Sequence, residues 1–512
     1  MRARHRNGST ALLGTLLSVA LTASCGGTEE AGPTSTGTGL QTPNSPLVTL
    51  RVMFDTGSVD DPAGKNGLNA LTALMIGQGG SPALSYEQLT TTLYPWAASI
   101  GAQYDKEVTT IIGEVHRDHL EPFYEIFRDL IVAPRLDEAD FTRNRDFLTN
   151  AIVSSLRGND DEELGKQALN VLLYAGHPYE ATEMGTERGL AAITLDDVRA
   201  FHAGRYLRDN MLIGVAGGYP DGFLERVERD LGGALPSGDD AGDRTLPAPR
   251  VVENIELLLV EKDAIATAIS IGFPINITRA SDDFYPLMVA NAYFGEHRTF
   301  IGRLMNQMRG LRGLNYGDYS YIENFIQDGG STFPVPNTPR RQQFFSLWIR
   351  PVPHHNAAFA LRQAVRELGL LVEQGLSPEE FEATREYLVN YSKLYVQTTS
   401  RRLGYAMDSR FYGTGPFVDE IRTRLESLTV DEVNAAVRRH LQAENLGIAV
   451  VTRDAEAFRD ALLSDAPSSV TYNTEVDDAI LAEDEAIKSY PLVINPERVR
   501  VVPVEEMFVD VS

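Results

Sequence analysis

The sequence holds a single cysteine, Cys25, among its 512 residues. An intrachain disulfide needs two cysteines, so none can form, and stability must come from apolar cores. Positive charge is also scarce, because 46 Lys and Arg face 71 Asp and Glu and the formal net charge is −25. Binding to a phosphate backbone depends on clustered cations. The charge balance therefore argues against nucleic acid as a partner.

A long apolar run is missing at the N-terminus. The apolar residues 11–20 are fewer than the ~20 that a transmembrane helix needs. They follow the arginine-rich residues 2–6 and precede small residues, which is the pattern of a secretory signal. Cys25 stands where a bacterial lipoprotein signal is cut and its cysteine lipidated, although Thr22 is not the usual aliphatic residue at its position. The alternative is an ordinary cleaved signal with a chance cysteine.

These features predict a location in the bacterial cell envelope. We expect the chain to lie on the periplasmic face, anchored to a membrane through a lipid on Cys25. Gly26 follows in place of the acidic residue that retains lipoproteins in the inner membrane, so the outer membrane is preferred.

The rest of the composition is that of a globular protein. Apolar residues make up 43% and charged residues 23%. A chain of 512 residues is expected to fold as several domains and not around a single core.

The sequence contains an internal repeat. Residues 194–217, "TLDDVRAFHAGRYLRDNMLIGVAG", parallel residues 429–452, "TVDEVNAAVRRHLQAENLGIAVVT". Residues 136–150, "LDEADFTRNRDFLTN", parallel residues 376–390, "LSPEEFEATREYLVN". The offsets are nearly equal, about 235 and 240 residues. The folded part is therefore predicted to be two copies of one unit.

Each copy combines helices and strands. A threonine or serine caps a helix with acidic residues in its first turn, and a short aliphatic strand follows. This alternation favours helices packed on a sheet. The predicted boundaries are a signal peptide 1–25, a flexible tether 26–45, an N-terminal repeat 46–234, a linker 235–251, a C-terminal repeat 252–465 and a C-terminal extension 466–512.

Three stretches carry a resemblance to a known family. They are "GSVDDPAGKNGL" at 57–68, "GHPYEATEMGTERGL" at 176–190 and "QMRGLRGLNYGDYS" at 307–320. In their order, and with the duplication, the chain resembles the insulinase and pitrilysin family, which includes the mitochondrial processing peptidases and the core proteins of the respiratory bc1 complex. The resemblance implies an α+β fold with two tandem homologous α/β-sandwich domains, as in LuxS and insulinase-type metalloenzymes. Each domain would hold a mostly antiparallel sheet covered by helices.

Active members of that family carry the inverted zinc motif H-x-x-E-H on the first helix. The matching positions here are Ala70, Ala73 and Leu74, none of which can bind a metal or move a proton. The family's third ligand is a glutamate some 75 residues further on, and the matching residues 147–155 contain no carboxylate. The resemblance thus implies a degenerate zinc site, so we expect no zinc in this chain.

The histidines offer no clear substitute site. His116 and His119 follow a predicted strand and are interpreted as a solvated surface cluster. His177 in "GHPY" is interpreted as structural, and His354 with His355 as part of a loop beside a proline.

A second feature of the family is retained. Active members use an arginine and a tyrosine seven residues apart to hold the substrate backbone and the developing oxyanion. Arg309 and Tyr316 have that spacing, and Arg312 is a competing candidate for the arginine. The alternative is a tyrosine that packs at a strand start and an arginine paired on the surface.

The resemblance implies a non-catalytic subunit. In two-chain members one chain holds zinc and the other supplies the Arg/Tyr pair. We therefore expect this chain to be inactive alone and to pair with a zinc-bearing homologue as a heterodimer, or else to form a homodimer. Its substrate would be a peptide or an unfolded protein. The alternatives are a scaffold or peptide-binding protein with no role in proteolysis, and an active peptidase with an unrecognised metal site.

Overall fold

The computed structural model describes residues 37–238, 244–296, 302–327, 331–464 and 466–511. The predicted signal peptide, with Cys25, lies outside the described residues. Within the described ranges, no helix has both the length and the apolar character needed to cross a membrane.

The N-terminal repeat is built on a five-stranded sheet with the order β1-β5-β2-β4-β3. Neighbouring strands are antiparallel except for β1 and β5. The strands are β1 (Gly37–Gln41), β2 (Leu47–Phe54), β3 (Ser99–Tyr104), β4 (Thr109–His116) and β5 (Met211–Gly217). The helices are α1 (Leu68–Gly77), α2 (Tyr86–Leu93), α3 (Leu120–Val132), α4 (Glu138–Asn150), α5 (Asp161–Leu173), α6 (Glu187–Ala192), α7 (Leu195–Arg205) and α8 (Phe223–Ala234).

The C-terminal repeat has the same topology with one added strand. Its six-stranded sheet has the order β11-β6-β10-β7-β9-β8, so that the five strands other than β11 repeat the first sheet in chain order. The strands are β6 (Ile255–Glu261), β7 (Thr267–Ile275), β8 (Asp318–Tyr321), β9 (Gln343–Val352), β10 (Gly447–Thr452) and β11 (Ile494–Pro503). The helices are α9 (Phe284–Phe294), α10 (Ala357–Gln374), α11 (Pro378–Tyr391), α12 (Thr399–Phe411), α13 (Phe417–Ser427), α14 (Val430–His440), α15 (Ala455–Leu463) and α16 (Asp478–Lys488). The shared strand order confirms the predicted duplication and the α+β class.

The helix caps follow the sequence signals. Thr194 accepts a hydrogen bond from the backbone N–H of Asp197 at the start of α7. Thr429 does the same for Glu432 at the start of α14. In both cases the acidic side chain accepts from the backbone N–H of the threonine, which completes a capping box. These paired caps begin equivalent helices in the two repeats.

The central strands of both sheets are buried on both faces. In β5, Ile213 and Val215 belong to the main core of the N-terminal repeat, whereas Leu212 and Ala216 point to the opposite face. Because side chains alternate across a strand, two separate layers must cover this sheet. Helices α1, α3 and α8 pack against strands of this sheet.

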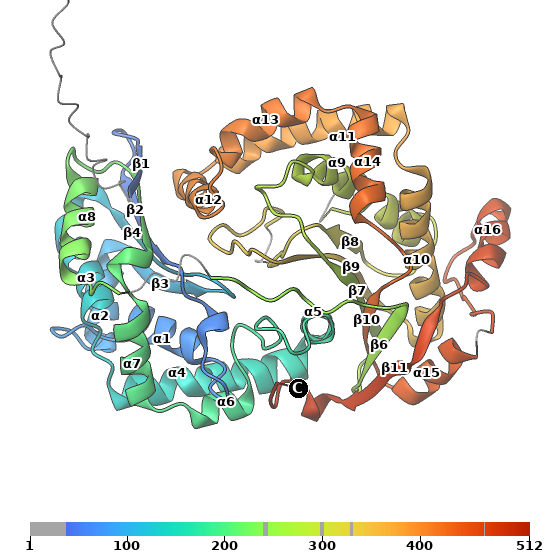
Figure 1. The fold of residues 1–512 in the computed structure, drawn as a ribbon, viewed down its shortest axis with the longest axis horizontal. Coiled ribbons are helices and arrows are strands. Elements are labelled where there is room, and N and C mark those ends of the chain that lie inside the picture. Colours follow the sequence, from blue (N-terminus) through green and yellow to red (C-terminus); the bar gives the residue numbers. More distant parts are fainter. Residues whose placement is uncertain (1–36, 239–243, 297–301, 328–330, 465, 512) are drawn as a thin grey trace, which may run out of the picture. The chain divides into compact units, whose positions relative to one another are not determined.

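The inner face of each sheet is covered by a helix of the other repeat. Helix α12 packs on β1 and β5 through Leu403 and Met407. Figure 1 shows α12 on the side of the first sheet that faces the C-terminal repeat. Helix α5 packs in the same way on β7 and β10 of the C-terminal sheet. A Cβ at Gly214 would stand 2.5 Å from the sulfur of Met407, so a larger residue there would force the Met407 side chain to move. The two repeats thus exchange helices.

A buried charge cluster also joins the repeats. The connection between β8 and β9, residues 322–342, reaches the turn between β3 and β4. Arg340 donates from Nε to Asp105 at 2.8 Å, and Arg341 pairs with Glu107. Asp105 is 1% exposed and Arg340 4% exposed. Charges buried to this degree are stable only when they are paired and hydrogen-bonded.

The predicted tether is wrong for its last part. Residues 37–41 form β1, which pairs in parallel with β5. Its sequence GTGLQ has little apolar character. An edge strand needs only backbone hydrogen bonds and is half-exposed, so no hydrophobic pattern marks it. The C-terminal extension contains the helix α16 and the strand β11.

Candidate functional site

Helix α1 stands where the family's zinc motif would lie, and it is anchored by an acidic cap. Its N-cap, Gly67, has a φ of 107°, which favours glycine. Asp61 accepts hydrogen bonds from the backbone N–H groups of Gly67 and Asn69, both at 2.7 Å. Burial raises the pKa of Asp61 to about 7, and these two hydrogen bonds oppose that shift. The sequence therefore still supplies the residues that cap the start of α1.

The three positions that match the zinc motif are buried. Ala70 and Ala73 have no exposed surface and Leu74 is 3% exposed. Ala70 and Leu74 belong to the same apolar core as Ile152 and Leu156. None of the motif side chains has a donor or acceptor atom, and apolar contacts occupy the space around them. A zinc ion requires three protein ligands and a water, so this site does not fit zinc.

The segment that matches the third ligand is a π-helix. It spans Ala151–Asn159 directly after α4, and Ile152 and Leu156 are buried. A π-helix is rare and is often found at functional sites. Residues 147–155 offer no carboxylate to a metal. In the described part of the chain, no group of three or more His, Cys, Asp or Glu side chains is arranged to hold a metal ion.

The other histidines make ordinary contacts. His119 stacks on Trp96 with the ring centroids 5.3 Å apart, and His116 pairs with its neighbour Asp118. His177 is buried, and one ring nitrogen lies 2.9 Å from the carbonyl oxygen of Pro247. His354 lies with Nδ1 2.8 Å from the hydroxyl of Thr267 and Nε2 3.1 Å from a backbone carbonyl. His355 lies in the short helical turn 354–356.

Arg309 and Tyr316 lie against each other. The guanidinium carbon of Arg309 is 4.8 Å from the centroid of the Tyr316 ring, within the range of a cation–π contact. Arg309 belongs to a short π-helix, Met305–Gly310, and its Nη1 lies 3.9 Å from the sulfur of Met305. Tyr316 is 69% exposed, which is unusual for so large a ring. The structure therefore presents the pair on the surface.

Arg350 is a third member of this group that the sequence did not reveal. Its guanidinium carbon lies 5.5 Å from the Tyr316 ring centroid. Its Nε donates to Glu162 at 2.9 Å, and Glu162 lies on α5, the helix contributed by the N-terminal repeat. Both arginines adjoin the same exposed ring. No sequence motif marks Arg350, which is a single charged residue within β9. It comes close to Tyr316 because β9 pairs with β8.

Arg312 has a different environment. It is 3% exposed, and its guanidinium pairs with Glu483 and Asp484 on α16. Burial lowers the pKa of Arg312, but together these two carboxylates outweigh it and hold the pKa above its usual value. Because its donors are occupied, Arg312 cannot also bind a substrate. Of the two candidate arginines, Arg309 is the one that stands beside Tyr316.

A buried aspartate, Asp318, lies near Arg309 and Tyr316. Asp318 begins β8 and is fully buried, and it accepts a hydrogen bond from Asn315 at 2.7 Å. Among the described residues, its Oδ2 has no hydrogen-bond partner. Burial raises the pKa of Asp318 to about 8, and the hydrogen bond from Asn315 and the nearby charge of Arg309 oppose the rise. The raised pKa therefore favours the protonated form of Asp318 at neutral pH.

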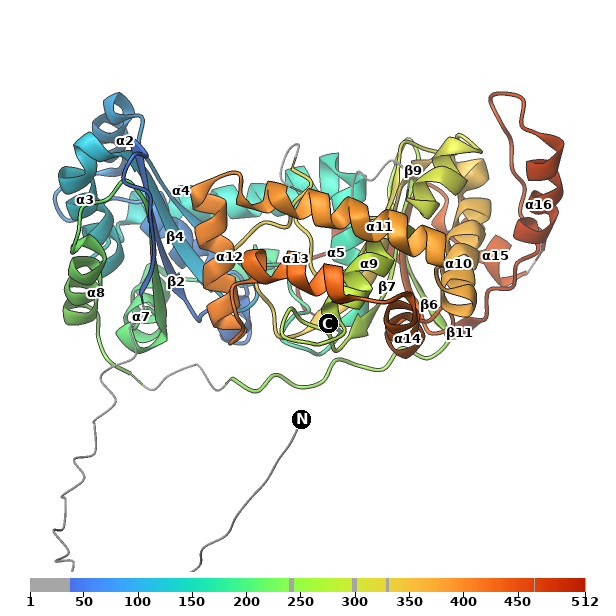
Figure 2. The same ribbon diagram turned by 90° about the horizontal axis from the view of Figure 1, so that it is seen from above.

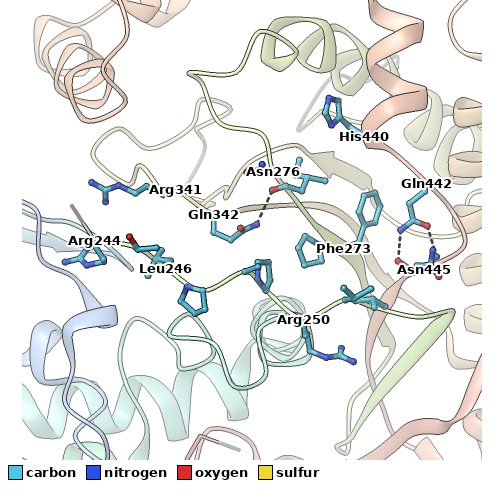
Figure 3. Close-up of a pocket in the computed structure, with 18 residues that line it drawn as sticks. Arg244, Leu246, Arg250, Phe273, Asn276, Arg341, Gln342, His440, Gln442 and Asn445 are labelled. Carbon is cyan, nitrogen blue, oxygen red and sulfur yellow. Dashed lines mark hydrogen bonds between the residues drawn. The ribbon is translucent and has the colours of Figure 1, made fainter. Parts of the chain in front are cut away.

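A separate groove of about 810 Å³ follows the linker between the repeats (Figure 3). Several arginines and a histidine that line it already have acidic partners. Arg244 pairs with Asp60 at 2.6 Å, and His440 lies 2.7 Å from Asp283. Arg341 pairs with Glu107. No functional residue predicted from the sequence lines this groove.

Comparison with known proteins identifies the fold. Residues 40–187 match the family model described as insulinase (peptidase family M16), and residues 192–388 match the model described as the peptidase M16 inactive domain. An "uncharacterized zinc protease YmxG" of Bacillus subtilis is 22% identical, over 79% of this chain and 93% of its own length. A "non-peptidase homolog YmxG" of Helicobacter pylori is 21% identical, over 80% of this chain and 89% of its own length.

Solved structures agree on the architecture. The "peptidase M16 inactive domain" from Pseudomonas fluorescens superposes with a TM-score of 0.71 at 20% identity, covering 81% of this chain and 94% of the other. A "protease from Helicobacter pylori" superposes with a TM-score of 0.68 at 14% identity, covering 81% and 96%. With two successive family models matched, the chain belongs to the insulinase (M16) peptidase family, as a member in which the zinc motif is absent.

Proposed function

We propose that this chain is the non-catalytic subunit of a two-chain peptidase, whose zinc is held by a homologous partner. The observation that carries the proposal is an asymmetry between two sites of one chain. The motif positions on α1 hold only apolar side chains, whereas Arg309 and Tyr316 lie together with Tyr316 exposed. This is the arrangement expected of a chain that no longer holds the metal but still contacts the substrate.

The pair has the chemistry that a peptidase partner needs. The hydroxyl of Tyr316 donates to the oxygen of the scissile carbonyl as negative charge develops there, and Arg309 binds the substrate backbone beside it. Donors placed at a developing oxyanion are worth a factor of roughly 10² to 10³ in rate. They need only stand near the carbonyl, so they can belong to a chain that holds no metal.

The decisive experiment mixes the purified chain with its zinc-bearing homologue and follows cleavage of an unfolded peptide. We expect the mixture to be active and each chain alone to be nearly inactive. Tyr316→Phe should lower kcat by about 10² because it removes the donor, and Arg309→Ala should raise KM as well. Arg422→Ala, on an exposed face of α13, is the control that leaves activity unchanged. Full activity in both site variants would overturn the role of the pair.

The same mixture separates this function from a scaffold role. A chain that forms only a stable homodimer and binds no zinc-bearing homologue would be a scaffold, and the Arg/Tyr pair a remnant. Zinc bound stoichiometrically to this chain alone would instead indicate an active peptidase with different ligands.

We also propose that the chain is lipid-anchored at the periplasmic face of the outer membrane. The support is the secretory signal followed by Cys25 and Gly26. Radiolabelled palmitate should label the native chain and not Cys25→Ser, and the label should fractionate with the outer membrane. Equal labelling of both, or label in the inner membrane, would contradict the anchor or its membrane respectively.

A further inference from the structure

The C-terminal extension, residues 466–511, lies beyond the residues that the family models match. Its helix α16 packs beside α10 at the edge of the C-terminal repeat (Figure 2). Its strand β11 then joins the sheet by pairing in parallel with β6. The extension is therefore an integral part of the fold.

One buried arginine connects the extension to the Arg/Tyr pair. The side chain of Arg312 has no exposed surface. Its Nε donates to Asp484 at 2.9 Å and its Nη2 donates to Glu483 at 2.8 Å. Asp484 is 1% exposed and also accepts a hydrogen bond from the hydroxyl of Tyr472. Charge-assisted hydrogen bonds from two nitrogens of one guanidinium to two different carboxylates fix its orientation as well as compensate its charge.

The opposite edge of the same guanidinium holds the turn that carries Arg309. Nη1 of Arg312 donates to the carbonyl oxygen of Gln307 at 3.0 Å and to its side-chain oxygen at 3.2 Å. Gln363 of α10 donates to the same carbonyl at 3.2 Å. Gln307 and Arg309 belong to the one π-helical turn, Met305–Gly310. Arg312 therefore links α16 to the backbone that orients Arg309.

We propose that the C-terminal extension is a positioning element, in which Asp484 acts through Arg312 to hold Arg309 against Tyr316. The inference rests on the proposed function for its effect on catalysis. A π-helical turn is rare and uses i→i+5 hydrogen bonds, and this one is held from outside by Arg312 and Gln363. A misplacement of about 1 Å in a catalytic group can cost about 10² in rate. The extension thus acts on the site without contacting substrate.

Two readouts on Asp484→Asn test the proposal. The first is hydrogen exchange of the full chain alone, where residues 305–316 should exchange about tenfold faster while α9 keeps its protection. The second is cleavage with the zinc-bearing homologue, where kcat should fall about tenfold with KM and partner affinity unchanged. Asp484→Glu keeps the charge and should restore much of both. Glu485→Gln, an exposed neighbour on α16 that pairs with Lys488, is the matched control.

The two measurements can contradict the positioning role and the proposed function independently of each other. Unchanged exchange at residues 305–316 in Asp484→Asn would overturn the positioning role, whatever the mixture does. A mixture that shows no activity even with the unmodified chain would overturn the proposed function, and hydrogen exchange would still decide the role of the extension. A uniform rise in exchange over the whole C-terminal repeat would also overturn the inference, because it would reduce Asp484 to general stability.

Discussion

Nε of Arg350 in the C-terminal repeat donates a hydrogen bond to Glu162 of the N-terminal repeat at 2.9 Å. The guanidinium of Arg350 also adjoins the exposed ring of Tyr316. The orientation of Tyr316 therefore depends on a helix that its own repeat does not supply. The exchange of α5 and α12 thus bears on the candidate site and not only on the stability of the fold.

Removing the charge of Glu162 should weaken the candidate site modestly. Glu162→Gln leaves Arg350 without its ion-pair partner, so Arg350 will sample other positions around Tyr316. A cation–π contact at an exposed site is worth about 0.5–1 kcal/mol, so kcat of the mixed complex should fall roughly two- to fivefold. Steady-state peptide cleavage measures this. Glu163→Gln, one position along α5, should have no effect, and an equal loss in both variants would contradict the assignment.

The buried pair between Arg340 and Asp105 should matter far more for stability. Arg340→Ala leaves Asp105 buried without its partner, and loss of one member of such a pair costs about 3–5 kcal/mol. Urea denaturation should show this as a lower midpoint. Arg422→Ala breaks an exposed pair with Glu426, where the side chains are 60% and 48% exposed, and should cost about 0–1 kcal/mol. Similar midpoints for the two variants would refute the argument from burial.

Rebuilding the zinc motif should not rebuild a zinc site. The combined change Ala70→His, Ala73→Glu and Leu74→His places polar side chains at positions that are 0–3% exposed, while residues 147–155 still offer no third ligand. We expect no stoichiometric zinc by metal analysis and a clear fall in Tm, because buried polar groups without partners and overpacking both destabilise.

A matched control for this variant exists on α2. Glu87→His, Thr90→Glu and Thr91→His create the same spacing at exposed positions and should leave Tm nearly unchanged. Zinc that survives dialysis in the α1 variant, with Tm preserved, would show that the helix can still accept a metal.

Asp318 should make stability fall as pH rises. Its folded-state pKa is raised to about 8, whereas an ordinary aspartate titrates near ~4. Between these values the folded chain holds a proton that the unfolded chain has released, so the contribution of Asp318 to the free energy of unfolding decreases with pH and levels off above about 8. Asp318→Asn removes this dependence, and its Tm should exceed that of the native chain by more at pH 8.5 than at pH 5. Asp263→Asn, whose side chain is 89% exposed, should show no such trend.

The sequence predicted most features that depend on local chemistry. Thr194 and Thr429 marked equivalent helix starts because a capping hydroxyl and an acid three residues later interact within one turn. Strand β1 was missed because GTGLQ forms an edge strand through its backbone alone. The role of Arg312 was left open because the sequence does not show that Asp484, far along the chain, would pair with it.

The exchange of helices could not be predicted from the sequence in the same way. The apolar face of α12 shows that it covers a surface, but not that the surface belongs to the other repeat. Arg350 was missed for a related reason, since its partners Glu162 and Tyr316 come from different repeats. Tertiary pairing decides these contacts, and no local pattern records them.

The exchange of helices also bears on how the protein is made. The inner face of the first sheet, with Met53 and Ala216, packs against Leu403 and Met407 of α12. During synthesis this apolar face stays bare until most of the second repeat has left the ribosome. Neither repeat is then expected to fold stably without the other. Cleavage of the linker should leave two fragments that remain bound to each other. We therefore expect the two repeats to be stable only together, although they arose by duplication.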